Sequence, residues 1–245
     1  MAPRSTNRVA VYRSNRDIRV DTRPAPAIGA GELLLAVHAS GICGSDLMEW
    51  YRRPRAPAVL GHEVAGRVVA AAEGADGVAA GDRGVATHHV PCGVCRYCVR
   101  GRETVCEMLR RTEFDPGGFA EYVRLPAENV KHGVLKLPPH VSDDAGSMVE
   151  PLGCVLRAQR KAGVSHGESV LVIGAGVSGS LHVLAARAKG ASPIFVTDVQ
   201  AARRDFAARL GADRVLDAAG DVAQQIRSDL GRGVDHAIVC TGAPG

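Results

Sequence analysis

The sequence predicts an α/β protein in two parts, a β-rich N-terminal part followed by a doubly wound parallel sheet. Three observations lead to this class. Short β-rich runs separated by Gly and Pro turns fill residues 8–125, strands and helices alternate after residue 142, and a glycine turn joins one of these strands to a helix. The change of character near residues 140–165 divides the chain into residues 1–150 and residues 151–245.

The elements follow from local pattern. In the first part, the β-rich runs predict strands over residues 9–12, 18–20, 32–39, 63–72, 85–87 and 120–125. Residues 143–162 have apolar positions at helical spacing and predict one helix, with Ser142 as its N-cap. After it we expect strands over 169–173, 193–197, 215–216 and 237–241, alternating with helices over 179–189, 201–210 and 222–230.

Four strands are fewer than the roughly six of a full dinucleotide-binding domain. We therefore expect that the parallel sheet is incomplete at its C-terminal end, or that another structure pairs with its open edge.

Composition restricts the class of partner. The chain has 245 residues, 46% of them apolar and 23% charged, and a net charge of +4, which together are ordinary for a soluble globular protein. This charge is too small to favour nucleic acid, and no apolar run is long enough to span a bilayer. The N-terminus lacks the apolar segment of a signal peptide. Seven cysteines, four of them in one tight cluster, indicate a reducing compartment, so we expect a cytoplasmic protein.

The tight cluster of cysteines has the spacing of a zinc site. Cys92, Cys95, Cys98 and Cys106 form a C-x2-C-x2-C-x7-C pattern. Four thiolates fill a tetrahedral shell and leave no open position, so the predicted site is structural. It would hold residues 91–111, an arginine-rich segment with few apolar residues. A zinc-ribbon module for nucleic acid is the alternative, but glutamates interleave with the arginines and favour a solvated surface.

A second, mixed set of ligands precedes and follows this cluster. Cys43, His62, Glu63 and Glu150 offer one sulfur, one nitrogen and two carboxylates. A catalytic zinc needs three protein ligands and one position left for water or substrate, where it acts as a Lewis acid. Each residue alone is weak evidence, since Cys43 could be a packing residue and Glu150 could favour a helix N-terminus by its charge.

The glycine turn has the pattern G-x-G-x-x-G between a predicted strand and a helix. Gly174 permits a tight turn, Gly176 lets the backbone approach a pyrophosphate, and Gly179 lets helix and strand pack closely. Backbone N–H groups at the start of the helix, near Val177, are suited to bind the anion. The turn therefore predicts a nicotinamide dinucleotide site.

Asp198, at the end of the next strand, favours NAD over NADP. A carboxylate there accepts hydrogen bonds from the ribose hydroxyls and repels a 2′-phosphate. Arg203 weakens this preference, because an arginine nearby can receive a phosphate. The alternative role for Asp198 is a cap of the following helix.

Together these motifs resemble those of the medium-chain zinc-dependent alcohol and polyol dehydrogenases, and most of all their sorbitol-dehydrogenase branch. The resemblance covers nearly the whole chain. It rests on Gly41-Ile-Cys43-Gly-Ser45-Asp46, Gly61-His62-Glu63, Gly81-Asp82-Arg83, the four cysteines, Gly117-Gly118-Phe119-Ala120-Glu121-Tyr122, Glu150-Pro-Leu and the glycine turn.

The resemblance implies a GroES-like catalytic domain, a Rossmann domain, two zinc ions per chain and a homodimer or homotetramer in the full-length form. It implies that Cys43 and His62 are ligands of the catalytic zinc. Glu63 is then a ligand or lies close to one, and Glu150 binds the zinc or its water. Ser45 would hydrogen-bond the substrate oxygen and begin the path of the proton to solvent. It also places Thr241 near the cofactor.

Three features depart from the family pattern. Met48 stands where many members have a proton-relay histidine, which leaves the proton route beyond Ser45 open. Arg52, Arg53 and Arg55 make the next segment basic, which is compatible with an anionic or highly polar substrate, although solvated surface charges explain it equally simply. Family members also continue beyond the length of this chain.

The expected function is the NAD-dependent oxidation of a secondary alcohol, of polyol, sugar-alcohol or cyclitol type, to a ketone. The alternatives within enzymes are a polyol phosphate, an amino-substituted cyclitol or threonine as substrate. The alternative of another class is a non-catalytic protein that retains the zinc and NAD sites.

Overall fold

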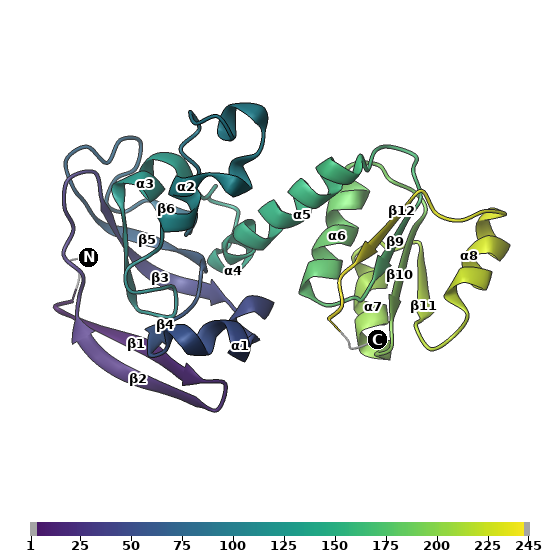
Figure 1. The fold of residues 1–245 in the computed structure, drawn as a ribbon, viewed down its shortest axis with the longest axis horizontal. Coiled ribbons are helices and arrows are strands. Elements are labelled where there is room, and N and C mark those ends of the chain that lie inside the picture. The colour runs from purple at the N-terminus through teal and green to yellow at the C-terminus, as the bar shows by residue number, and fades with distance from the viewer. Residues whose placement is uncertain (1–3, 243–245) are drawn as a thin grey trace. The chain divides into compact units, whose positions relative to one another are not determined.

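The computed structural model of the chain describes residues 4–242. The start of the first predicted domain range, residues 1–3, and the end of the second, residues 243–245, lie outside the described residues. The chain divides into two compact units, Met1–Glu150 and Pro151–Gly245 (Figure 1). The mixed α/β class is confirmed, with antiparallel sheets in the first unit and a parallel sheet in the second.

Two antiparallel sheets form the first unit. The larger has the order β7-β3-β5-β6-β8, and the smaller has the order β2-β1-β4. Their strands are β1 (Thr6–Ser14), β2 (Asp17–Pro24), β3 (Leu33–Gly41), β4 (Ala58–Val59), β5 (Glu63–Ala71), β6 (Arg83–Thr87), β7 (Tyr122–Leu125) and β8 (Val134–Lys136). Alternate apolar residues of the central strands, among them Leu33, Leu35, Val64 and Val123, are buried in one core.

Short helices connect these strands, and most of them were not predicted. They are η1 (Gly44–Leu47), α1 (Glu49–Arg52), η2 (Arg53–Arg55), η3 (Cys98–Arg100), η4 (Glu103–Val105), α2 (Glu107–Arg111), α3 (Ala127–Gly133) and α4 (Asp143–Ser147).

The register of the large sheet brings three strand ends together. Gly41 at the end of β3 pairs with Glu63 at the start of β5, and Glu63 pairs with Thr87 at the end of β6. The chain segments that follow Gly41 and Thr87, and the one that precedes Glu63, therefore meet at one edge of the sheet. Cys43, His62 and His88 belong to these segments.

The single helix expected over residues 143–162 is two helices. Ser142 caps α4 as predicted, its hydroxyl accepting from the Ala145 N–H at 3.1 Å. The helix then stops at Ser147, and α5 (Val149–Ala162) begins after Met148. Pro151 explains the break, because its ring would clash with the carbonyl of Ser147 in a continuous helix, whereas the first turn of a new helix tolerates it.

The second unit contains four parallel strands in the order β11-β10-β9-β12. They are β9 (Val170–Ile173), β10 (Ile194–Asp198), β11 (Arg214–Asp217) and β12 (His236–Val239), alternating with α6 (Val177–Ala188), α7 (Ala201–Arg209) and α8 (Val222–Leu230) (Figure 1).

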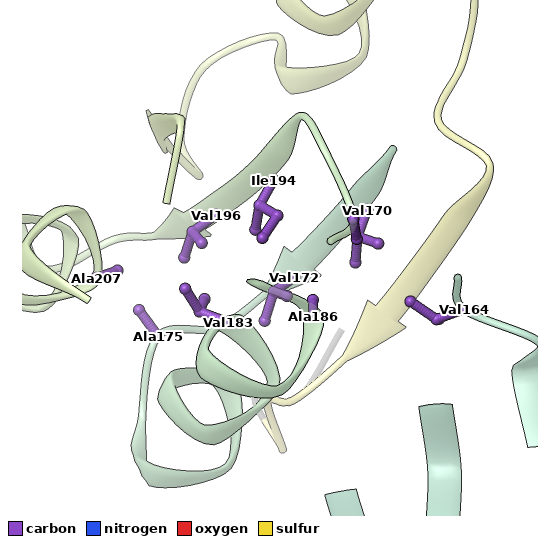
Figure 2. Close-up of a cluster of buried hydrophobic side chains, with 10 residues drawn as sticks. Val164, Val170, Val172, Ala175, Val183, Ala186, Ile194, Val196 and Ala207 are labelled. Atoms are coloured by element: carbon purple, nitrogen blue, oxygen red, sulfur yellow. The ribbon is translucent and has the colours of Figure 1, made fainter. Parts of the chain in front are cut away.

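Helices cover both faces of this sheet, as a doubly wound fold requires. On one face, Val172 of β9, Val196 of β10 and Val183 of α6 point toward one another in a buried cluster (Figure 2). On the other face, Phe195 of β10 packs in a second cluster with Ile226 of α8. Successive residues of β10 thus face opposite layers.

Within residues 4–242, none of the helices combines the length and the apolar character that crossing a membrane would demand.

Candidate functional site

Cys43, His62 and Glu63 form one compact group of metal-binding side chains. One ligand atom from each lies within 4.8 Å of the others, and the group is well shielded, since His62 is 8% and Glu63 4% exposed. Gly41 makes room for the carboxylate, because a Cβ at this position would collide with the side chain of Glu63. A thiolate, an imidazole and a carboxylate are a donor set that fits zinc.

Asp46 orients two members of this group. Its Oδ2 accepts from the backbone N–H of Cys43 at 3.1 Å, and its Oδ1 lies 3.7 Å from Nδ1 of His62. The backbone N–H of Ser45 points toward the sulfur of Cys43 at 3.5 Å. Asp46, which is 5% exposed, therefore fixes the turn that carries Cys43 and faces the ring of His62.

Charge interactions favour the thiolate of Cys43. A hydrogen bond with His62 lowers the pKa of this thiol, although burial opposes the change. Burial lowers the pKa of His62, but Cys43, Asp46 and Glu150 outweigh it, so the net shift is upward. A bound metal would take the place of the imidazole proton, so metal binding at this group depends on pH.

Glu150, the second residue of α5, is not part of the compact group. Its carboxylate nevertheless acts on His62 by its charge, and burial raises the pKa of Glu150 itself. Burial also raises the pKa of Glu63, against the opposing charge of His62. Glu63 thus lies within the compact group with Cys43 and His62, whereas Glu150 lies outside it.

The four cysteines of the predicted structural site come together as a second group. Their sulfur atoms are 3.9 Å apart for Cys92 and Cys98, 3.5 Å for Cys95 and Cys98, and 3.7 Å for Cys92 and Cys106. A tetrahedral site with zinc–sulfur bonds of about 2.3 Å has sulfur atoms about 3.8 Å apart. The observed separations therefore fit a tetrathiolate zinc and are far too long for disulfides.

Backbone groups support this second site. The N–H of Cys95 points to the sulfur of Cys92 at 3.3 Å, and the N–H of Cys92 points to the sulfur of Cys106 at 3.5 Å. Backbone donors from Cys92 and Leu109 lower the pKa of Cys106 to about 6. Around the cluster, Val94 and Val99 are 81% and 68% exposed, so this segment has little apolar core of its own.

A cavity of about 470 Å³ opens beside the mixed ligand group. Ser45, His62, His88 and His89 line it. The ring centroids of His62 and His88 are 4.6 Å apart, and those of His88 and His89 are 3.8 Å apart. Burial, and then the charge of His89, lowers the pKa of His88 to about 3, so His88 is neutral at physiological pH. The Nδ1 of His88 is buried without a hydrogen-bond partner in the described structure.

Arg52, the last residue of the short helix α1, also lines this cavity. Arg52 donates from Nε to the backbone oxygen of Ser45 and from Nη2 to its Oγ, both at 2.9 Å. Nη2 also lies 3.4 Å from Oδ1 of Asp46. Met48, in contrast, is 46% exposed and does not line the cavity.

In the second unit, the glycine turn has the geometry expected of a phosphate-binding loop. Gly174 has a positive φ of 98°, and a Cβ at Gly179 would collide with the carbonyl oxygen of Gly174. A Cβ at Gly176 would meet nothing within 4 Å, so this part of the turn faces open space. Val177 begins α6 and is 61% exposed, which leaves the start of the helix accessible to an anion.

Asp198 lies at the end of β10 and contacts the glycine turn directly. Its Oδ2 accepts from the N–H of Ala175 at 2.9 Å, and its Oδ1 accepts from the N–H of Gln200 at 2.8 Å. These donors and the guanidinium of Arg203, 3.7 Å away, overcome burial and lower the pKa of Asp198. The carboxylate therefore stays charged beside the loop.

Thr241 also lies close to this loop. A Cβ at Gly174 would be 3.2 Å from the Cβ of Thr241 and 3.0 Å from the carbonyl oxygen of Cys240, so the end of β12 runs against the turn. The residues predicted to contact the cofactor are thus grouped at the carboxyl ends of β9, β10 and β12. They are Gly174, Gly176, Val177, Asp198, Arg203 and Thr241.

The sequence motifs did not indicate Asp46 as an orienting group, and they did not indicate His88 and His89. The Thr87-His-His sequence after β6 was a usable signal, because strand pairing puts Thr87 opposite Glu63. The sequence presented Arg52 only as a charge, because the contact of Arg52 with Ser45 depends on the unpredicted helix α1.

Comparison with known proteins agrees with this arrangement. Residues 29–139 match the family model of the alcohol dehydrogenase GroES-like domain, and residues 178–245 match that of the zinc-binding dehydrogenases. An L-threonine 3-dehydrogenase from Pyrococcus furiosus is 38% identical over 228 residues, which are 89% of this chain and 64% of that protein. The chain therefore spans less than two thirds of this relative.

Two further relatives extend the comparison. A sorbitol dehydrogenase from Ovis aries is 34% identical over 98% of this chain and 70% of its own length. A zinc-binding dehydrogenase from Sinorhizobium meliloti bound to NADP has a TM-score of 0.83 and 32% identity, covering 98% of this chain and 71% of the other. With both family models matched in order along its length, the chain belongs to the medium-chain zinc-dependent alcohol and polyol dehydrogenase family.

Proposed function

We propose that this protein oxidises a secondary alcohol to a ketone and transfers the hydride to NAD. The observation that carries the proposal is the grouping of Cys43, His62 and Glu63 within 4.8 Å of one another, next to a cavity that also contains Ser45. Three protein ligands leave one position open, as a catalytic zinc site requires.

Zinc held by Cys43, His62 and Glu63 would supply a Lewis acid for the substrate oxygen. Arg52 donates to one lone pair of Ser45 Oγ, so the other lone pair can accept the hydroxyl proton of the alcohol. As it accepts this proton, Ser45 would release its own hydroxyl proton toward solvent, while the carbinol hydrogen would pass to NAD as hydride. Glu150 would hold a water or exchange places with Glu63 near the ligand group.

We further propose two zinc ions per chain, one catalytic at the mixed group and one structural at Cys92, Cys95, Cys98 and Cys106. Residues 1–150 then form the catalytic domain, and residues 151–245 form the NAD-binding domain. Gly174, Gly176, Val177, Gly179, Asp198, Arg203 and Thr241 would contact the dinucleotide. The charged Asp198 supports NAD, while the exposed Arg203 and the NADP-bound relative keep NADP as the second candidate.

Polyols, sugar alcohols and cyclitols are the leading substrates, supported by the sorbitol dehydrogenase relative. Threonine is the second candidate, supported by the threonine dehydrogenase relatives. A small-molecule substrate, a homo-oligomer and a cytoplasmic location complete the proposal, the last because four clustered thiolates need a reducing compartment.

The test is NADH formation by zinc-loaded protein with polyols, polyol phosphates, threonine and simple alcohols, using NAD and NADP in parallel. Turnover that is lost in Cys43→Ser but kept in Cys154→Ser supports the proposal. Zinc and NAD binding without turnover of any alcohol would instead identify a non-catalytic protein.

A further inference from the structure

The cavity beside Ser45 and His62 has a cationic wall. Arg52 and Arg55 both line it, and Arg52 already touches the hydroxyl that would contact the substrate oxygen. We infer that this cavity binds an anionic group of the alcohol substrate, a carboxylate or a phosphate ester, through Arg52 and Arg55. This inference rests on the proposed function, because it names the class of substrate for the same site.

The two arginines are held in place by one aromatic ring. The guanidinium carbon of each lies 4.8 Å from the ring centre of Tyr51, and Nη1 of Arg55 donates to the Tyr51 hydroxyl at 3.1 Å. Arg52 ends α1 and Arg55 ends η2, and Pro54 between them restricts the backbone. A stacked guanidinium loses less conformational freedom when it binds a ligand, so this arrangement favours binding.

The positive charge of this wall is only partly balanced within residues 4–242. Arg52 faces the buried Asp46 at 3.4 Å, but Arg55 has no carboxylate partner among residues 4–242. Glu113 is the one acidic residue that lines the cavity, and it is exposed. Arg55 is therefore the lining cation without an ion-pair partner among these residues, and it can offer its charge to a ligand.

The size and the donor geometry fit a small anionic alcohol. A volume of about 470 Å³ lies within the range of small-molecule sites. The planar fork of an arginine matches the paired oxygens of a carboxylate or phosphate, and such bonds are stronger than those to neutral hydroxyls. A substrate whose hydroxyl reaches Ser45 and whose anion lies a few bonds away would satisfy Arg55 and the free donors of Arg52.

Matched substrates that differ only in charge test the inference. Initial rates with 3-hydroxybutyrate and sorbitol 6-phosphate are compared with those of the neutral 3-hydroxybutyramide and sorbitol. In a pair that the enzyme oxidises, we expect kcat/KM to be about tenfold higher for the anionic substrate than for the neutral one. A preference within the hydroxybutyrate pair would indicate a carboxylate, and a preference within the sorbitol pair would indicate a phosphate ester. Arg55→Gln should remove most of this preference through KM. Arg53→Gln, an exposed arginine outside the cavity lining, should not.

A calorimetric titration keeps the test independent of turnover. Inorganic phosphate and 3-hydroxybutyrate should bind the wild-type protein and Arg53→Gln, and should bind Arg55→Gln about tenfold more weakly. Equal kcat/KM within each pair, or equal binding by the two variants, would overturn the inference while leaving the alcohol oxidation intact. Absence of NADH from every substrate with anion binding retained would instead count against the proposed function alone.

Discussion

Arg52 donates to both oxygens of Ser45, with Nε 2.9 Å from the backbone oxygen and Nη2 2.9 Å from Oγ. In a chain where Met48 stands at the usual place of a relay histidine, this contact gives the hydroxyl a fixed neighbour. Arg52 cannot relay a proton, because its guanidinium stays protonated. Its effect is to orient the Ser45 hydroxyl and to favour negative charge on the oxygen that the hydroxyl faces.

Replacing Arg52 with Met should therefore affect the chemical step. We expect kcat to fall about tenfold, the loss of one charge-assisted hydrogen bond, and the acidic limb of the pH profile of kcat to move to higher pH. Steady-state rates from pH about 6 to 10 would show this, and Arg53→Met is the matched control. A change in KM alone would mean that Arg52 serves only to bind substrate.

Metal content should follow the two clusters separately. The wild-type protein is expected to hold two zinc ions per chain, and Cys98→Ser should hold one, because a tetrathiolate site that loses a ligand binds zinc much more weakly. Elemental analysis by mass spectrometry after gel filtration measures this. The exposed Cys154, changed to Ser, is the control. Retention of two zinc ions by Cys98→Ser would refute the assignment.

Two alanine substitutions in the glycine turn should have different effects. Gly179→Ala should lower the free energy of unfolding by about 1–3 kcal/mol, because its Cβ would press on the carbonyl of Gly174. Gly176→Ala should change stability by less than about 0.5 kcal/mol, since its Cβ meets nothing within 4 Å, yet it should weaken NAD binding. Urea denaturation and NAD titration separate the two effects, and equal destabilisation would contradict the geometry.

Asp235 should make the second unit sensitive to acid. Arg232 and Ser169 hold the pKa of its carboxyl well below the ordinary value of 3.8, with Ser169 Oγ donating at 2.7 Å. The stabilisation is complete above pH 3.8, where the unfolded chain is also deprotonated, and is lost as the pH falls below it. Thermal melts at falling pH should show this loss in the wild type and in Asp205→Asn, and a smaller loss in Asp235→Asn. Parallel curves for all three proteins would exclude this role.

Local pattern predicted the regular elements of the fold well. The helix Val222–Leu230 lies where its apolar spacing placed it, and β9, β10 and α6 lie within two residues of their predicted bounds. Elements that depend on a distant partner were missed. Strand β4, Ala58–Val59, has only two residues and exists because it pairs with Val11 and Tyr12 of β1.

The grouping of the candidate metal ligands could be predicted, because cysteine spacing and the glycine turn are local patterns with a chemical meaning. Their surroundings could not. Whether Arg52 reaches Ser45, and whether His88 and His89 stack beside His62, depends on the register of β5 and β6 and on the course of a four-residue helix. These are tertiary relationships that no window of the sequence contains.

The exposed valines around the cysteine cluster have one more consequence. With zinc bound by its four cysteines, a segment without an apolar core would depend on the metal for its shape, so removing zinc should release it while the sheets on either side stay folded. Five arginines, Arg96, Arg100, Arg102, Arg110 and Arg111, lie between Cys95 and Thr112. Trypsin should therefore leave the zinc-loaded protein intact and cut the chelated protein within this loop, which makes proteolysis a direct report of the metal state of the chain.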